Sequence, residues 1–291
     1  MPLEASELIL NPDQSIYHLN LLPEDLAPTV ILVGDPGRVP QVSSYFDHID
    51  VKKSKREFVT HTGYYRGKHL SVVSTGIGTD NIDIVLNELD ALVNIDFKNK
   101  KIREPLTRLE LIRVGTSGAI QADIPVDSMV LSEMAIGFDG LLHFYDSGRV
   151  QMADMQFAFL EHSGWSVMKP VPYVVQADPE LCMKFQSDGI HRGFTATNSG
   201  FYAPQGRNLR LAPEDPHMNE KLTSFRFHGF RITNMEMETA GIFGLAALMG
   251  HAATALNCIL ANRETREFSK DPKQAIDRLI RYTLEHLARE S

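Results

Sequence analysis

The apolar residues of this chain gather in short, β-branched runs, separated by stretches in which apolar positions follow helical spacing. Runs of this kind predict buried strands. They lie at residues 29–33, 70–73, 109–114, 128–131, 194–196, 230–233 and 253–260. Strands that alternate with helical stretches are typical of an α/β fold, and we therefore expect a mixed central sheet flanked by helices.

Three stretches predict helices. Residues 82–93 place apolar side chains on one helical face, and Thr79 or Asp80 is suited to cap that helix. A second helical pattern covers about residues 237–249 and stops at Gly250. The last predicts a C-terminal helix that packs on the core through Ile276, Leu279, Ile280 and Leu287.

The chain has 291 residues, which is enough for one large α/β domain or two smaller ones. No stretch rich in Pro, Gly and Ser divides the sequence, so we expect a single domain over residues 1–291. The segment 94–108 is rich in Lys and Arg and interrupts the path from helix to strand. We expect this segment to be a solvated surface insertion.

Composition narrows the classes of partner. The formal net charge is −8, which disfavours a nucleic-acid binder because phosphate contacts need a basic face. Cys182 and Cys258 match no metal or redox spacing. The N-terminal residues lack the basic stretch of a signal peptide, and no apolar run approaches the roughly 20 residues of a membrane helix. We therefore expect a cytoplasmic protein with no membrane partner.

The first predicted strand ends in the segment Gly34-Asp35-Pro36-Gly37-Arg38. Glycine backbone can approach an anion closely, and an arginine adds a charged fork of donors. The segment lacks the Lys-Ser/Thr pair of a P-loop and the three spaced glycines of a dinucleotide fold. Taken alone, it could also be an ordinary strand-to-helix turn.

Two further glycine-rich segments are of the same kind. Arg113-Val114-Gly115-Thr116-Ser117-Gly118 is expected to form a loop after the strand at 109–114, and Ser74-Thr75-Gly76-Ile77-Gly78-Thr79 leads into a predicted helix. Ligands of open α/β sheets bind at the carboxyl ends of strands, where these loops would meet. Together the three segments predict an anion site.

Two later segments could contact the rest of a ligand. Glu236 and Glu238 lie among apolar residues, where they could accept from ligand hydroxyls or serve as acids at a helix N-terminus. Phe201, Gln205 and Arg207 combine an aromatic face with an amide and a guanidinium. This set matches a heterocyclic base edge with two carbonyls and an N–H, although an aromatic-anchored surface loop has the same composition.

In their order along the chain, these motifs resemble the nucleoside phosphorylase-I superfamily and, within it, the uridine phosphorylases. The resemblance implies a partly barrel-like mixed sheet and a pentosyltransferase that converts uridine and phosphate reversibly into uracil and ribose 1-phosphate. It is carried by Gly34–Arg38, Arg56-Glu57-Phe58, Ser74–Gly78, Arg113–Gly118, Phe201–Arg207, Glu236-Met237-Glu238 and Asn262-Arg263.

The resemblance also implies roles for individual residues. It assigns phosphate binding to Gly34, Arg38, Arg56, Arg113 and Thr116, with Arg56 supplied by a neighbouring subunit. It assigns ribose binding to His18, Thr116, Met237 and Glu238, with His18 reaching across a dimer interface to the 5′-hydroxyl. It assigns the base to Phe201, Gln205 and Arg207, and catalysis to Arg113, Arg207 and Glu238.

The same resemblance implies a homo-oligomer, at least a dimer, with shared active sites. No metal or cofactor is expected, since inorganic phosphate is a co-substrate. Purine-cleaving relatives usually carry an aspartate after the late strand, whereas this chain has Leu260-Ala261-Asn262-Arg263, which favours uracil. A phosphorylase of another nucleoside, a nucleosidase on the same fold and a non-catalytic binding protein are the alternatives.

Overall fold

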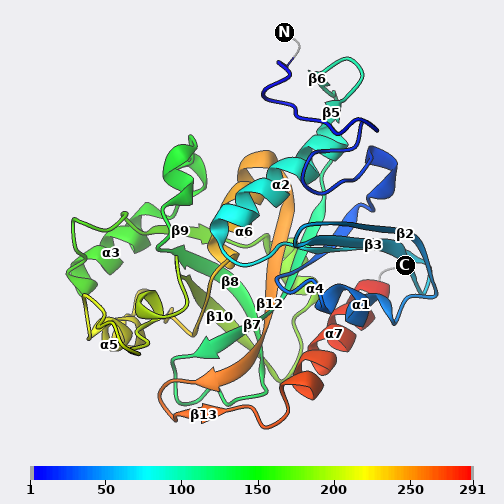
Figure 1. Cartoon of the computed structure of the whole chain (residues 1–291). Coiled ribbons are helices and arrows are strands. Elements are labelled where there is room, and N and C mark those ends of the chain that lie inside the picture. Colours follow the sequence, from blue (N-terminus) through cyan, green and yellow to red (C-terminus); the bar gives the residue numbers. More distant parts are fainter. Residues whose placement is uncertain (1–2, 290–291) are drawn as a thin grey trace.

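The β-branched runs become central strands of one 11-stranded mixed sheet in the computed structural model, which describes residues 3–289 (Figure 1). The strands are β1 (Thr29–Val33), β2 (His48–Lys55), β3 (Phe58–Tyr65), β4 (Lys68–Ser74), β5 (Ile95–Asp96), β6 (Lys101–Ile102), β7 (Glu110–Ala119), β8 (Met129–Gly137), β9 (Tyr173–Gln176), β10 (Ile190–Thr197), β11 (Asn234–Glu236), β12 (Ala252–Asn262) and β13 (Glu267–Phe268). Across the sheet the order is β13-β12-β8-β10-β11-β7-β1-β4-β3-β2, with β9 paired to β8. A separate small sheet joins β5 and β6, and residues 101–108, which begin with β6, are exposed.

Two long strands close part of the sheet into a barrel. β7 runs parallel to β12 along its whole length and pairs antiparallel with β11 at its end. β12 is antiparallel to β8, and β8 connects through β10 to β11. The strands β7, β12, β8, β10 and β11 therefore form a closed ring, from which β1, β4, β3 and β2 extend as an open sheet. The expected mixed, partly barrel-like sheet flanked by helices is confirmed.

Helices pack around this sheet, and in Figure 1 α2 and α6 lie side by side while α3 and α5 form a separate group. The helices are α1 (Arg38–Ser43), α2 (Thr79–Asn94), α3 (Ala153–Ser163), α4 (Pro179–Lys184), α5 (Met218–Ser224), α6 (Thr239–Met249) and α7 (Pro272–Ala288). Short 3₁₀ turns lie at Pro23–Asp25, Leu141–Phe144, Gly148–Val150 and Ala203–Gln205. Over residues 3–289, none of the helices is both long enough and apolar enough to span a membrane.

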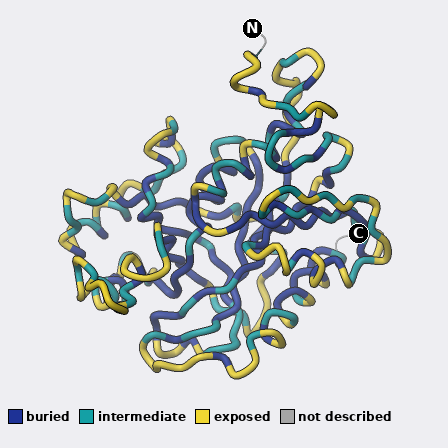
Figure 2. Tube along the Cα trace, viewed as in Figure 1, coloured by how far each residue is buried: buried dark blue, intermediate teal, exposed yellow. Residues whose placement is uncertain are grey.

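The burial of α6 and α7 follows from their patterns. α6 is apolar on every side, as expected for a fully enclosed helix, and its residues 239–246 are all buried. It ends at Gly250, the stop that the sequence predicted, and Gly250 adopts the left-handed conformation common at helix C-termini. α7 is amphipathic and packs on β12 and β7 through a face that includes Leu279, Ile280 and Leu287. Figure 2 shows this division between a buried centre of strands and an exposed periphery.

Two predictions of local structure are wrong. The expected strand at residues 230–233 is replaced by a turn in which Phe227 and Phe230 pair across Gly229, and β11 begins only at Asn234. The expected loop at Gly115–Gly118 is instead the second half of β7, because these residues stay paired with β12. Glycine-rich sequence therefore remains extended here.

The expected side-chain cap of α2 is also wrong. Gly78 occupies the N-cap position with a φ of 97°, a conformation that favours glycine, and makes no side-chain cap. Its backbone N–H donates to the side chain of Glu238 instead. The hairpin of β2 and β3 was missed because β2 has no buried face: its residues alternate between exposed and half-buried.

The cap of α7 offers a test of the fold. The Asp271 side chain accepts a hydrogen bond from the Gln274 N–H at 3.0 Å and so satisfies one open donor of the first turn. We expect Asp271→Ala to lower the free energy of unfolding by about 1 kcal/mol, measured by urea denaturation. Lys273→Ala, an exposed change in the same turn, is the control and should stay within about 0.5 kcal/mol of the wild type. Equal stabilities of the two variants would contradict the assignment.

Candidate active site

A cavity of about 790 Å³ lies where β1 and the closed ring meet. Its walls come from the segments after β1 and β4, from β7, from the segment after β10, and from β11 with the start of α6. Most residues that the sequence predicted for one site line this cavity together. They are Gly34, Arg38, Arg113, Thr116, Phe201, Gln205, Arg207, Met237 and Glu238.

Arg113 is the buried charged centre of the cavity and is 6% exposed. Its guanidinium folds back over its own strand and lies directly against Gly115. A Cβ atom added at Gly115 would lie only 1.8 Å from Arg113 Nη1 and 2.4 Å from Cζ. The glycine at position 115 therefore makes room for the arginine while the backbone continues as β7.

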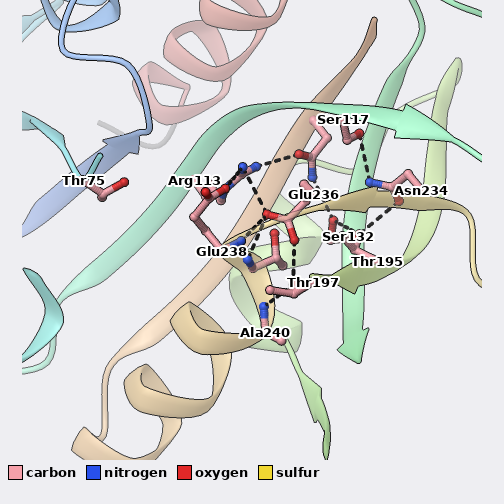
Figure 3. Close-up of polar contacts among 12 residues, drawn as sticks. Thr75, Arg113, Ser117, Ser132, Thr195, Thr197, Asn234, Glu236, Glu238 and Ala240 are labelled. Atoms are coloured by element: carbon pink, nitrogen blue, oxygen red, sulfur yellow. Dashed lines mark hydrogen bonds and ion pairs between the residues drawn. The ribbon is translucent and has the colours of Figure 1, made fainter. Parts of the chain in front are cut away.

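Two glutamates share this guanidinium (Figure 3). Arg113 Nη2 lies 2.6 Å from Glu238 Oε2 and 3.1 Å from Glu236 Oε2. The other oxygen of Glu238 accepts a hydrogen bond from the Gly78 N–H at 2.8 Å. Both carboxylates are buried, and a buried carboxylate is tolerated only where charge and hydrogen bonds compensate it.

Glu236 and Glu238 differ in what holds them. Glu236 Oε2 accepts from the backbone N–H groups of Glu238 and Thr239, each at 2.9 Å, and Oε1 accepts from the Thr197 hydroxyl at 2.6 Å. The interpretation of a helix N-terminal acid thus describes Glu236. Glu238 makes no such cap, and its carboxylate is bound by Arg113 and the Gly78 N–H.

The charges of this cluster shift one another's pKa values. Burial raises the pKa of Glu238; the Arg113 charge opposes that rise, and the Glu236 charge adds to it. Burial lowers the pKa of Arg113, but the two glutamates outweigh burial and raise that pKa above its usual value. Arg113 is therefore a permanent cation, and two carboxylates compete for it.

Arg38 brings a second guanidinium to the same end of the cavity. It begins α1, directly after the Gly34–Gly37 turn, and its Nη1 donates to the Val114 carbonyl at 3.3 Å. Burial lowers the pKa of Arg38, and the nearby Arg113 charge lowers it further. An anion bound between the two guanidinium groups would relieve this repulsion. In the described part of the chain, no group of three or more His, Cys, Asp and Glu side chains is placed to hold a metal ion.

Arg207 also lines this cavity and stacks on Phe201 with its guanidinium carbon 3.6 Å from the ring centroid. Its Nη1 donates to the buried Gln205 Oε1 at 2.7 Å and to the Phe201 carbonyl at 2.5 Å. Burial, and next the charge of Arg263, lower the pKa of Arg207 to about 10. Arg207 is therefore charged at neutral pH, and with Gln205 it can bind a planar ligand that carries both donors and acceptors.

Residues 28–288 match the family model described as the phosphorylase superfamily. This chain belongs to the phosphorylase superfamily. A uridine phosphorylase of Thermococcus kodakarensis is 32% identical over 260 residues, which cover 87% of this chain and 80% of that protein. A purine nucleoside phosphorylase of the DeoD type from Hahella chejuensis is 30% identical over 240 residues, which cover 82% of this chain and 83% of that protein.

Among solved structures, a nucleoside phosphorylase of Trypanosoma brucei that shows uridine phosphorylase activity aligns with a TM-score of 0.87 and 30% identity. The alignment covers 97% of this chain and 99% of that chain. The phosphorylase fold expected from the sequence motifs is therefore confirmed along nearly the whole chain.

Two residues that the motifs assigned to the phosphorylase site lie outside the cavity of this chain. His18 Nδ1 is 2.7 Å from Glu88 Oε1, and the exposed Arg56 lies over Tyr17 in the turn between β2 and β3. Neither lines the cavity, although Glu57, next to Arg56, does. Both residues were expected to reach the site of a neighbouring subunit, and that role stays a prediction.

Sequence reasoning missed one residue that holds the phosphorylase site together. Arg113 Nη1 donates to Asn257 Oδ1 at 2.6 Å, and Asn257 is fully buried in β12. The available signal was an amide in the middle of the apolar run 253–260. For Glu236 the sequence left two roles open, and the structure places it both at the N-terminus of α6 and beside Arg113.

The packing of Arg113 over Gly115 can be tested directly. A methyl group at Gly115 cannot coexist with the observed guanidinium, so Gly115→Ala must displace Arg113 from Glu238 and Asn257. We expect the Kd for inorganic phosphate, measured by calorimetry, to rise about 10- to 100-fold, the range for loss of a hydrogen bond to a charged group.

Gly148→Ala adds the same methyl group where no atom lies within 4 Å and should leave phosphate affinity unchanged. Unaltered phosphate affinity in folded Gly115→Ala would show that the position of Arg113 does not matter for the anion.

Proposed function

We propose that this chain is a uridine phosphorylase, which converts uridine and inorganic phosphate reversibly into uracil and ribose 1-phosphate. The observation that carries the proposal is the set of groups in one cavity. Arg38 lies close enough to Arg113 for their charges to repel, Glu238 pairs with Arg113, and the Gln205–Arg207 pair lines the same cavity. Membership of the phosphorylase superfamily supports the proposal, as do relatives that are named uridine phosphorylase or show that activity.

In this proposal, Glu238 binds the sugar. A carboxylate accepts hydrogen bonds from ribose hydroxyls, and the half-buried Met237 offers an apolar contact to the ring. Glu238 then acts as an acceptor and transfers no proton. Because Glu238 also pairs with Arg113, the sugar and phosphate sites share one ion pair.

The chemistry follows from charge. As the glycosidic bond lengthens, positive charge builds on the ribose and negative charge builds on uracil. Arg207, with Gln205, stabilises the negative charge on the uracil carbonyls. Phosphate held by Arg38, Arg113, Thr116 and the Gly34 backbone stabilises the cation and attacks C1′. Such alignment of a nucleophile can be worth about 7–11 kcal/mol.

The charge count at the phosphate end supports a shared site. Glu236 and Glu238 pair with Arg113, and Asp35 lies near Arg38, so the two arginines bring no excess positive charge before phosphate binds. A phosphate anion would leave the site with excess negative charge. We propose that Arg56 of a neighbouring subunit supplies the missing cation, and that His18 of that subunit contacts the ribose, which makes the enzyme at least a dimer.

We further propose that no cofactor takes part, because phosphate itself is the nucleophile and no covalent enzyme intermediate is needed. The enzyme would work in the cytoplasm, where nucleosides and phosphate are available for pyrimidine salvage.

Purine nucleosides are the second candidate, since a purine nucleoside phosphorylase is among the relatives. The contacts of Asn262 favour uridine instead. Its amide donates to the carbonyls of Gln121 and Ile124, and its oxygen accepts from the N–H groups of Glu264 and Thr265. Asn262 is thus fully used in shaping its turn and has no proton to give to a purine N7.

Arg38 tests the phosphate end. We expect Arg38→Ala to raise the KM for phosphate about 10- to 100-fold with little change in the KM for uridine, because it removes a charged donor from the anion alone. The matched control is Arg149→Ala, since Arg149 also donates to one backbone carbonyl but lies outside the cavity. A rise in the KM for uridine alone would contradict the phosphate assignment.

Arg207 tests the base end. We expect Arg207→Ala to lower kcat on uridine about 100- to 1000-fold, the effect of losing one oxyanion-stabilising donor, while the KM for phosphate stays near the wild-type value. Arg210→Ala removes an exposed charge from the same loop and serves as the control. Unchanged turnover of uridine by Arg207→Ala would rule out this base site.

A further inference from the structure

Asn257 links Arg113 to a set of polar side chains that runs around the inside of the closed ring. The set contains one residue from each ring strand, namely Asn257 on β12, Ser132 on β8, Thr195 on β10, Asn234 on β11 and Ser117 on β7. We call it the polar belt. It begins at Arg113 and ends at Ser117, which are both on β7, so it completes the circuit of the barrel (Figure 3).

Each contact in the polar belt is a hydrogen bond between buried atoms. Asn257 Nδ2 donates to Ser132 Oγ at 3.1 Å, and Ser132 Oγ lies 2.6 Å from Thr195 Oγ1. Thr195 Oγ1 donates to Asn234 Oδ1 at 3.1 Å, and Asn234 Nδ2 donates to Ser117 Oγ at 3.0 Å. The four residues from Asn257 to Asn234 have no exposed surface.

The direction of donation is fixed by Arg113. A guanidinium only donates, so the atom of Asn257 that faces Arg113 is the oxygen and the atom that faces Ser132 is the N–H. Ser132 accepts that N–H, and its own proton is satisfied only by donation to Thr195. Thr195 must then donate to the Asn234 oxygen, which also accepts from the Thr233 hydroxyl at 2.7 Å, and both contacts leave the Asn234 N–H for Ser117.

Ser117 receives the last donation with its oxygen, so its own proton is left to donate elsewhere. Ser117 also lines the cavity, between Thr116 and Gly118. A substrate acceptor atom in the cavity can take this proton.

We propose that Asn257 is a positioning residue of the site: it holds Arg113 at one end of the polar belt and, at the other end, makes the Ser117 hydroxyl a donor to the nucleoside. The inference rests on the proposed function. An amide is the side chain that fits, because it accepts from the arginine and donates to the serine. An aspartate would be a third carboxylate around one guanidinium, and an apolar residue would leave Arg113 Nη1 without an acceptor.

The test compares four variants by steady-state kinetics with phosphate and uridine varied separately. Asn257→Leu is expected to raise the KM for phosphate about 10- to 100-fold, because a hydrogen bond to a buried cation is lost. Ser132→Ala and Ser117→Ala keep the Arg113–Asn257 bond, and each should raise the KM for uridine about 2- to 10-fold with the KM for phosphate unchanged. Thr254→Val is the control: it removes another buried hydroxyl of β12, one that contacts Cys182 and no residue of the belt.

If these residues had a merely structural role, all four variants would lose thermal stability. Their KM values for phosphate and for uridine would then change together, with no difference between the two substrates. A wild-type KM for phosphate in folded Asn257→Leu would overturn the positioning role, and an unchanged KM for uridine in Ser132→Ala and Ser117→Ala would overturn the role of the belt. If Asn257→Leu does not fold, Asn257→Asp keeps the shape and should also weaken phosphate binding, through its added negative charge.

Calorimetric titration with inorganic phosphate separates this inference from the proposed function. If the wild-type enzyme does not cleave uridine, the proposed function fails. The phosphate Kd of the Asn257 variants then still decides whether Asn257 positions Arg113.

Discussion

The shared pairing of Arg113 with Glu236 and Glu238 is the interaction on which the site depends. All three charges are buried, and the removal of one partner from such a cluster typically costs about 3–5 kcal/mol because the others are left uncompensated. Much of the local structure keeps the cluster intact. Gly115 makes room for the guanidinium, the N-terminus of α6 binds Glu236, and the Gly78 N–H binds Glu238.

The closed ring explains why this cluster can exist in a protein interior. β7 and β12 run side by side through the ring, so Arg113 and Asn257 meet at a fixed distance across neighbouring strands. The open sheet then delivers Arg38 from the end of β1 to the same cavity. Barrel strands and open-sheet loops thus contribute to one cavity: Arg38, proposed to bind phosphate, follows β1, and the residues proposed to bind the base lie on the segment after β10.

The sequence predicted most of this arrangement and failed where tertiary contacts override local pattern. Apolar runs such as 29–33 and 253–260 marked buried strands correctly, because burial on both faces leaves a continuous apolar signature. The glycines of Gly115–Gly118 predict a loop, yet the segment is a strand paired with β12. Glycine occurs at position 115 because the side chain of Arg113 folds over it. Asn257 could not be assigned from the sequence, since its partner Arg113 lies on another strand and only the ring closure brings the two together. His18 and Arg56 lie outside the cavity of the single chain, and their predicted roles depend on a neighbouring subunit.

The most direct measurement is the identity of the products formed from uridine in the presence and absence of inorganic phosphate. A site that holds phosphate between Arg38 and Arg113 as the attacking group should release uracil and ribose 1-phosphate, and only when phosphate is supplied. Release of uracil and free ribose without phosphate would contradict the account, because water would then be the nucleophile and the paired arginines would have another purpose.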